Sequence, residues 1–159
     1  MSLDGILAPL LHARTVENAL AFTRRSADFS VVDGLRAPML AALLREAGEP
    51  RAVLAVTPTG RESEALRRAI GCYLPDARVV EFPAWETLPH ERLSPSAETV
   101  GRRIAALRDL RDWDGERDGH LILVASVRAA LQPLAAGLAD APTVTLNRGG
   151  RGYDLAELT

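Results

Sequence analysis

Uninterrupted apolar segments constrain the fold of this chain more than any other feature. Residues 52–56 (Ala-Val-Leu-Ala-Val) and 121–125 (Leu-Ile-Leu-Val-Ala) contain no alternation of polar and apolar side chains. Strands with this composition are buried on both faces, as they are in parallel sheets. Between the two segments, apolar residues recur at helical spacing, for example within residues 62–72. The alternation of such strands with helices predicts an α/β fold, a doubly wound parallel sheet with helices on both faces.

The same criteria give a full set of expected elements. The expected strands are 29–32, 52–56, 78–82, 120–125 and 143–146. The expected helices are 16–25 with Thr15 as N-cap, one with Pro38 in its first turn that Gly48 ends, 62–72, one that Ser94 caps with Pro95 at its first position, and a short one that Ser126 caps. Residues 112–119 are polar, and we predict a disordered loop there.

Three regions follow from this order of elements. Residues 1–27 are expected to form N-terminal helices that pack on the core. Residues 28–141 form the α/β domain itself. Residues 142–159 change in character, because a strand and a glycine-rich stretch lead into a helix that has barely begun. We interpret them as the start of an inserted second domain.

Composition excludes several functions. All 19 basic residues are arginine, so Schiff-base chemistry and the lysine of a phosphate-binding loop are both absent. Cys72 is the single cysteine, which rules out an internal disulfide and a multi-cysteine metal site. The N-terminus lacks a basic signal region, and no apolar run approaches the length that crosses a membrane. We therefore expect a cytoplasmic protein without a metal site.

The segment after the first expected strand is where open α/β sheets bind phosphate. A working loop needs several glycines, whose N–H groups surround the phosphate, followed by lysine and a hydroxyl residue. This position reads Asp33, Gly34, Leu35, Arg36, Ala37 and Pro38. It has one glycine, a proline in place of a donor, and a carboxylate that repels phosphate. We interpret it as a degenerate phosphate loop and expect no nucleotide cofactor; a plain strand–helix turn fits it better.

Two sets of residues are candidates for a partner surface. Trp85 and Glu86 follow the third expected strand, where Trp85 either anchors a partner or packs over the sheet edge. Arg102, Arg103 and Arg108 form a basic stripe on the following helix, which either contacts nucleic acid or an acidic partner or is solvated surface. Thr57 and Thr59 either contact a nucleic-acid backbone or cap the next helix. No arrangement of these residues specifies a catalytic pair.

Longer segments carry a resemblance to a known family. Residues 82–95 (Phe-Pro-Ala-Trp-Glu-Thr-Leu-Pro-His-Glu-Arg-Leu-Ser-Pro) and the helix that starts near Val100 resemble the N-terminal region of the bacterial transcription-repair coupling factor, Mfd. Residues 54–66 and 120–133 resemble its neighbouring strands and helices. The resemblance extends from about Phe29 onward. That region is in turn similar to the excision-repair helicase subunit UvrB, which implies a RecA/helicase-like domain, called 1A, with residues 32–38 at the nucleotide loop.

The resemblance implies that this chain is part of a longer parent protein and that the two have different roles. The parent is an ATP-dependent DNA translocase, a hydrolase that uses ATP and Mg²⁺ on double-stranded DNA, displaces stalled RNA polymerase and recruits UvrA in nucleotide excision repair. The UvrA contact belongs mainly to the domain inserted after this one. This chain is expected to be non-catalytic and to position partners. The alternative is a small stand-alone α/β protein that binds a nucleotide or a nucleic acid.

Overall fold

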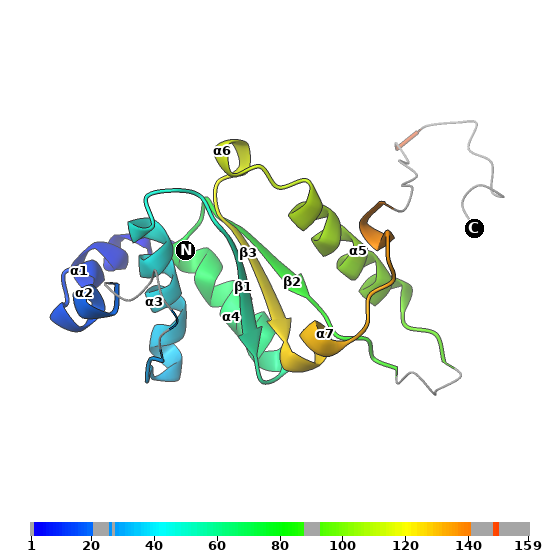
Figure 1. Ribbon diagram of the computed structural model, residues 1–159, viewed down its shortest axis with the longest axis horizontal. Coiled ribbons are helices and arrows are strands. Elements are labelled where there is room, and N and C mark those ends of the chain that lie inside the picture. Colours follow the sequence, from blue (N-terminus) through cyan, green and yellow to red (C-terminus); the bar gives the residue numbers. More distant parts are fainter. Residues whose placement is uncertain (1, 21–25, 27, 88–92, 141–147, 150–159) are drawn as a thin grey trace.

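The computed structural model describes residues 2–20, 26, 28–87, 93–140 and 148–149. In this part of the chain, three parallel strands form one sheet: β1 (Ala52–Thr57), β2 (Arg78–Phe82) and β3 (Leu121–Ser126). Their order is β1-β3-β2, so the last strand lies between the first two (Figure 1). The expected class, an α/β fold with a helix-flanked parallel sheet of the RecA/helicase type, is confirmed.

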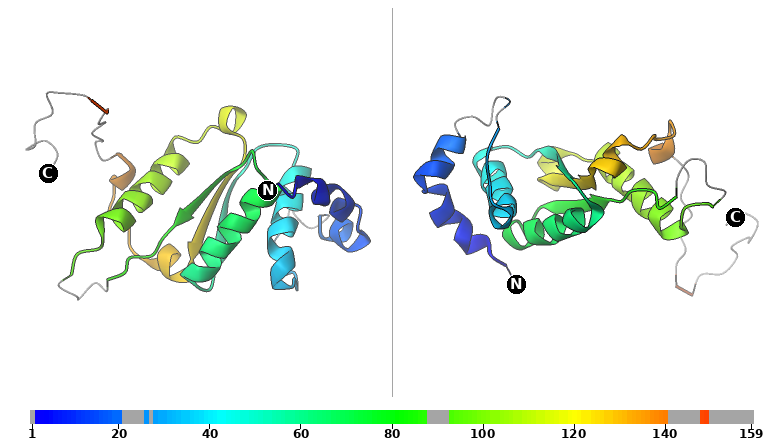
Figure 2. Two further views of the ribbon diagram at one scale, coloured as in Figure 1. Left: turned by 180° about the vertical axis from the view of Figure 1, so that it is seen from behind. Right: turned by 90° about the horizontal axis from the view of Figure 1, so that it is seen from below.

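Helices connect and flank these strands. They are η1 (Asp4–Ile6), α1 (Leu7–Leu11), α2 (Arg14–Leu20), α3 (Asp33–Glu46), α4 (Gly60–Tyr73), α5 (Ala97–Arg111), α6 (Gly115–Asp118), α7 (Val127–Leu131) and η2 (Leu138–Asp140). The N-terminal helices α1 and α2 lie beyond α3, on the side away from the sheet (Figure 2). None of the described helices combines the length and apolarity that a membrane crossing requires.

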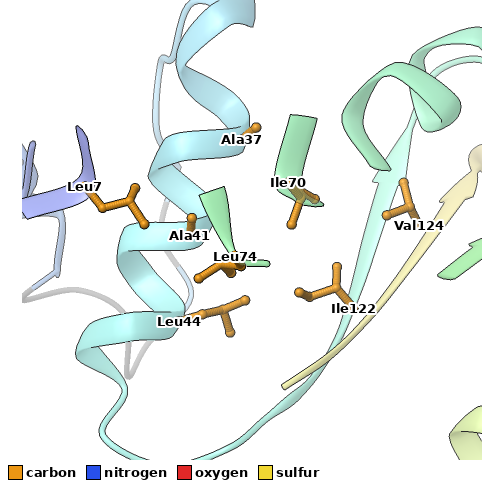
Figure 3. Packing of buried hydrophobic residues seen from close by; sticks show 8 residues of the cluster. All are labelled: Leu7, Ala37, Ala41, Leu44, Ile70, Leu74, Ile122 and Val124. Atoms are coloured by element: carbon orange, nitrogen blue, oxygen red, sulfur yellow. The ribbon is translucent and has the colours of Figure 1, made fainter. Parts of the chain in front are cut away.

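The main core lies between one face of the sheet and helices α3 and α4. Ile122 and Val124 of β3 meet Ile70 of α4 and Ala41 of α3, and Leu7 of α1 closes the cluster from outside (Figure 3). Each of these residues is fully buried. Burying one such branched side chain contributes about 1.5–3 kcal/mol. Ile122 and Val124, the strand residues of this cluster, belong to the apolar run at residues 121–125 that predicts a buried strand.

The opposite face is covered only in part. Phe82 and Ala125 pack there against Ala106 of α5 and Ala129 of α7. This second cluster covers β2 and β3. On β1 the side chains of Leu54 and Val56 remain 57% and 48% exposed. Helices therefore lie on both faces, as predicted, but the outer half of one face is open.

The strand expected at residues 29–32 is not formed. Val32 has an extended backbone and precedes α3, which begins at Asp33. Residues 28–32 line a hollow together with Leu10, Val16 and Met39, so they pack beside the N-terminal helices and α3. A strand needs the backbone of a neighbour for its hydrogen bonds, and this segment does not pair with β1. Pro38 is consequently an interior residue of α3 and not a first-turn residue.

Two expected helix starts are also wrong by a few residues. Helix α2 begins at Arg14, which places Thr15 inside it. Helix α5 is capped by Ser96, whose Oγ accepts a hydrogen bond from the Thr99 N–H at 3.2 Å, and not by Ser94. The local pattern contains two serines flanking a proline, and only the second can reach the third helical residue.

Residues 112–119 form an ordered turn and not the predicted disordered loop. Asp114 caps α6 by accepting from the Glu116 N–H at 3.1 Å. The Trp113 Nε1–H donates to the Gly119 carbonyl at 2.9 Å, and Gly119 has a φ of +67° that favours glycine. The polar composition of residues 112–119 therefore reflects helix capping and not disorder. The strand predicted at 143–146 and the second domain predicted at 142–159 lie outside the described residues, apart from residues 148–149.

Candidate functional site

The carboxyl ends of the three strands define the candidate site, because ligands of open parallel sheets bind at this edge. The turn after β1 and the segment after β2 enclose a cleft of about 390 Å³ there. Polar and charged residues contribute to its lining: Thr59, Ser63, Glu81, Glu86, Ser126 and Arg128. Trp85 is also one of the lining residues.

The hydroxyl groups at this edge are engaged within the chain. The Thr59 Oγ1 accepts from the Glu62 N–H at 3.2 Å and caps α4. Thr57 Oγ1 lies 2.7 Å from Ser63 Oγ. Ser126 Oγ accepts from the Ala129 N–H at 3.2 Å and caps α7. The capping interpretation of Thr59 is confirmed, and so is the predicted cap at Ser126.

The prediction that Arg103 belongs to an exposed basic stripe is wrong. Its side chain is fully buried, on the face of α5 that also buries Thr99 and Ala106. The guanidinium carbon lies 4.1 Å from the centroid of the Phe82 ring and 4.2 Å from that of Trp85. A sequence-based helical wheel assigns arginine to solvent, but two aromatic rings that stack on a planar cation offset that preference.

The buried guanidinium is incompletely paired. Its Nη1 donates to the Pro83 carbonyl at 2.6 Å, whereas Nε and Nη2 have no hydrogen-bond partner among the described residues. Burial lowers the pKa of Arg103 below its usual value, because desolvation disfavours the charged form. Arg103 therefore anchors the segment after β2 at a considerable electrostatic cost.

Trp85 is half-buried and held on two sides. Its ring stacks on Arg103, while its backbone N–H donates to Gln132 Oε1 at 2.7 Å and its carbonyl accepts from Gln132 Nε2 at 3.4 Å. The ring thus packs against the domain, as one of the two sequence-based alternatives expects, and it also lines the surface cleft. The other alternative, that Trp85 anchors a partner, stays a prediction.

Glu86 closes the start of α5. Its carboxylate accepts hydrogen bonds from Ser96 Oγ at 2.6 Å and from Thr99 Oγ1. These hydroxyl donors, with Ser96 the stronger, lower the pKa of Glu86 to about 2. The carboxylate is therefore ionised at neutral pH, and it serves the helix terminus more than it serves as a proton-transfer group.

The remaining arginines of the predicted stripe bind other parts of the domain. Arg102 Nη2 lies 2.8 Å from Glu81 Oε2 on β2, and its side chain stays 45% exposed. Arg108 Nε donates to the Ala139 carbonyl at 3.2 Å. Arg111 donates to the same carbonyl and to Asp140. The arginines of α5 thus point in different directions and do not form a continuous basic surface.

The predicted phosphate-loop residues lie in the first turns of α3. Asp33 and Arg36 form an ion pair at 2.9 Å, and Arg36 also approaches Glu62 at 3.7 Å. Two carboxylates therefore surround the one cation at this position. The segment follows no strand, so the expectation of a strand–loop–helix unit at residues 29–38 is wrong. That residues 33–38 do not bind phosphate stays a prediction.

Sequence reasoning missed the residues that hold Trp85 and Glu86 in place. Gln132 is 47 residues from Trp85, and no local pattern marks it. Ser96 did carry a signal, because serine is a typical N-cap residue. In the described residues, no group of three or more His, Cys, Asp or Glu side chains is arranged to hold a metal ion.

Comparison with known proteins gives one consistent result. The chain is 44% identical over 99 residues to the transcription-repair-coupling factors of Mycobacterium bovis (strain ATCC BAA-935 / AF2122/97) and Mycobacterium tuberculosis (strain CDC 1551 / Oshkosh). The aligned part is 61% of this chain but only 8% of each relative, so the chain spans a small share of their length. No family model matches the chain. The resemblance predicted from sequence is confirmed by these relatives.

Proposed function

We propose that this chain, related in sequence to the transcription-repair-coupling factors, is a non-catalytic module of such a factor, equivalent to its UvrB-like domain 1A. The observation that carries the proposal is the 44% identity over 99 residues. In this proposal the α/β domain is a scaffold that presents neighbouring parts of the polypeptide to their partners.

The environment of residues 33–38 supports a non-catalytic role. Nucleotide binding at a helix terminus requires free N–H groups and a favourable charge. The first turn of α3 instead presents the Asp33 carboxylate, which is paired with Arg36 and is 89% exposed. A triphosphate at this position would meet that carboxylate and would find no lysine in the chain.

The activity of the whole factor is a further part of the proposal. By resemblance, the parent would hydrolyse ATP with Mg²⁺, translocate on double-stranded DNA, displace stalled RNA polymerase and recruit UvrA, in the cytoplasm. We assign none of these reactions to residues of this chain. The contact with UvrA would belong mainly to the domain that follows.

Calorimetric titration of the 159-residue chain with MgATP tests the non-catalytic role. We expect no saturable heat up to about 1 mM nucleotide, which corresponds to a binding free energy weaker than about 4 kcal/mol. Saturable binding at micromolar concentration would refute it. Asp33→Ala is the matched variant: if nucleotide bound at α3, removing this carboxylate would strengthen binding, whereas a remote site would be unaffected.

The stand-alone nucleic-acid-binding alternative is tested on the same protein. It predicts duplex DNA binding at low salt that weakens steeply as salt rises. Because Arg102 and Arg108 are engaged with Glu81 and Ala139, we expect no such binding. Binding that Arg102→Ala abolishes would favour the alternative.

A further inference from the structure

A second hollow adjoins the cleft of the candidate site and shares Trp85 and Arg128 with it. It has a volume of about 490 Å³ and lies between the segment after β2 and the end of α7. Trp85, Pro95, Leu131 and Pro133 form its apolar walls. Leu131 is 80% exposed although it is a large aliphatic residue. An exposed leucine beside a tryptophan and two prolines is the type of surface that binds another chain.

The tryptophan of this groove is fixed before any partner arrives. Arg103 supports the ring of Trp85 from the domain interior. The side-chain amide of Gln132 accepts from the backbone N–H of Trp85 and donates to its backbone carbonyl. A side chain held in this way loses little conformational entropy on binding. Tryptophan is one of the residue types that most often dominate interface energies.

Charge indicates the composition of the partner. In the part of the chain that the structure describes, Arg128 is the charged residue that lines the groove, and its side chain has no ion-pair or hydrogen-bond partner there. Arg128 also lines the neighbouring cleft, together with Glu81 and Glu86, but it forms no ion pair with either carboxylate in the described structure, and neither carboxylate lines the groove. An acidic side chain would therefore be attracted to Arg128 here, whereas a basic one would be repelled.

We propose that the groove bounded by Trp85, Leu131 and Arg128 is a docking site for an extended protein segment that combines aliphatic residues with an aspartate or glutamate. The aliphatic side chains would cover Leu131 and the ring of Trp85, and the carboxylate would pair with Arg128. A single-stranded nucleic acid fits less well, because it needs a track of cations and several stacking rings. Among the residues that the structure describes, the groove offers one cation and one ring. This inference goes beyond the proposed function and does not depend on it.

Selection from a phage-displayed library of random peptides tests the proposal. The library is panned on the 159-residue chain after depletion on the Leu131→Asp variant, which removes peptides that bind elsewhere. Enriched peptides are then synthesised with a fluorescent label and titrated by anisotropy. We expect them to contain aliphatic residues next to aspartate or glutamate. Leu131→Asp should weaken their binding by at least about tenfold, a change of about 1.4 kcal/mol.

Charge reversal is the decisive variant. Arg128→Glu should weaken the acidic peptides by about tenfold and strengthen copies in which lysine replaces the acidic residue. Arg102→Glu, a charge reversal on α5 outside the groove, should leave both affinities unchanged. Residues 128 and 131 are exposed, so the variants should unfold at the same temperature as the parent. Failure to enrich any peptide, or enrichment of peptides insensitive to Arg128, would overturn the proposal. Binding of a labelled thymidine oligonucleotide that Arg128→Glu abolishes would assign the groove to nucleic acid instead.

Discussion

Arg103 is the position where substitution gives the clearest test of this structure. We expect Arg103→Met to change the free energy of unfolding by no more than about 1 kcal/mol, and Arg103→Ala to lower it by about 3 kcal/mol. Both changes remove the guanidinium. Only the second also removes the stem that fills the space between Phe82 and Trp85.

Two opposing sets of contributions lead to this expectation. The hydrogen bond from Nη1 to the Pro83 carbonyl contributes about 1.5–3 kcal/mol, and the two ring contacts contribute about 0.5–2 kcal/mol each. Against these stand several kcal/mol for removing a cation from water, and about 1–3 kcal/mol for an unpaired buried donor such as Nε or Nη2. The sum is close to zero, so methionine should substitute with little loss. Alanine leaves a cavity, which costs about 2–5 kcal/mol in well-packed interiors.

Urea unfolding followed by circular dichroism and tryptophan fluorescence measures both variants. Arg102 offers a matched control on the same helix, because its side chain is 45% exposed. There the Met and Ala variants should differ by less than about 0.5 kcal/mol. If Arg103→Met is as destabilising as Arg103→Ala, the contacts of the guanidinium outweigh its desolvation, and our reasoning about the buried cation is wrong.

Three further predictions concern single groups. The pKa of His120 should lie below 6.5, because burial and the charge of Arg51 disfavour its protonation, and its Nδ1 accepts from the Arg51 N–H at 3.1 Å. The stability that neutral His120 contributes is therefore complete above pH 6.5 and is lost as pH falls through the folded-state pKa; proton NMR titration measures this value, and one above 6.5 contradicts the assignment. The stability that the Glu86 carboxylate contributes is present above its ordinary pKa of 4.5 and is lost as pH falls toward about 2. Thermal melts at about pH 6 and about pH 3 should consequently show a smaller acid loss for Glu86→Gln than for the parent, and equal losses would argue against its hydroxyl contacts. Ser126→Ala should lower the free energy of unfolding by about 1–2 kcal/mol through loss of the α7 cap, whereas the exposed Ser94→Ala should change it by less than about 0.5 kcal/mol; equal effects in urea unfolding would reject Ser126 as the cap.

The predictable part of the fold is the part that local composition determines. The bounds of β1, β2 and β3 are predicted within a residue or two. Continuous apolar runs indicate β1 and β3 as strands of a parallel sheet, although one face of β1 stays partly exposed. The caps at Thr59 and Ser126 follow from side chains that reach only their own helix. The segment at residues 29–32 has the same β-type composition, but composition does not specify which neighbour supplies the hydrogen bonds.

The candidate site was less predictable because distant contacts form it. Trp85 was identified from its position after a strand, yet Gln132 and Arg103, which hold it, lie far away along the chain. The burial of Arg103 depends on Phe82 and Trp85 together, and a pattern of residue types along one helix cannot show it. The sequence therefore identifies Trp85 as a candidate site residue, but it does not identify Gln132 and Arg103, which hold Trp85 in place.

The two rims of the sheet have different consequences for how this domain behaves in concentrated solution. Along β2, ion pairs from Arg78 to Asp109 and from Arg102 to Glu81 place charge beside the strand and discourage a second strand from joining. The six residues of β1 are uncharged, and the described residues place no such ion pair along it; Leu54 and Val56 add apolar surface next to this edge. Self-association of purified material should therefore start at β1, and Leu54→Lys should raise the concentration at which aggregates appear.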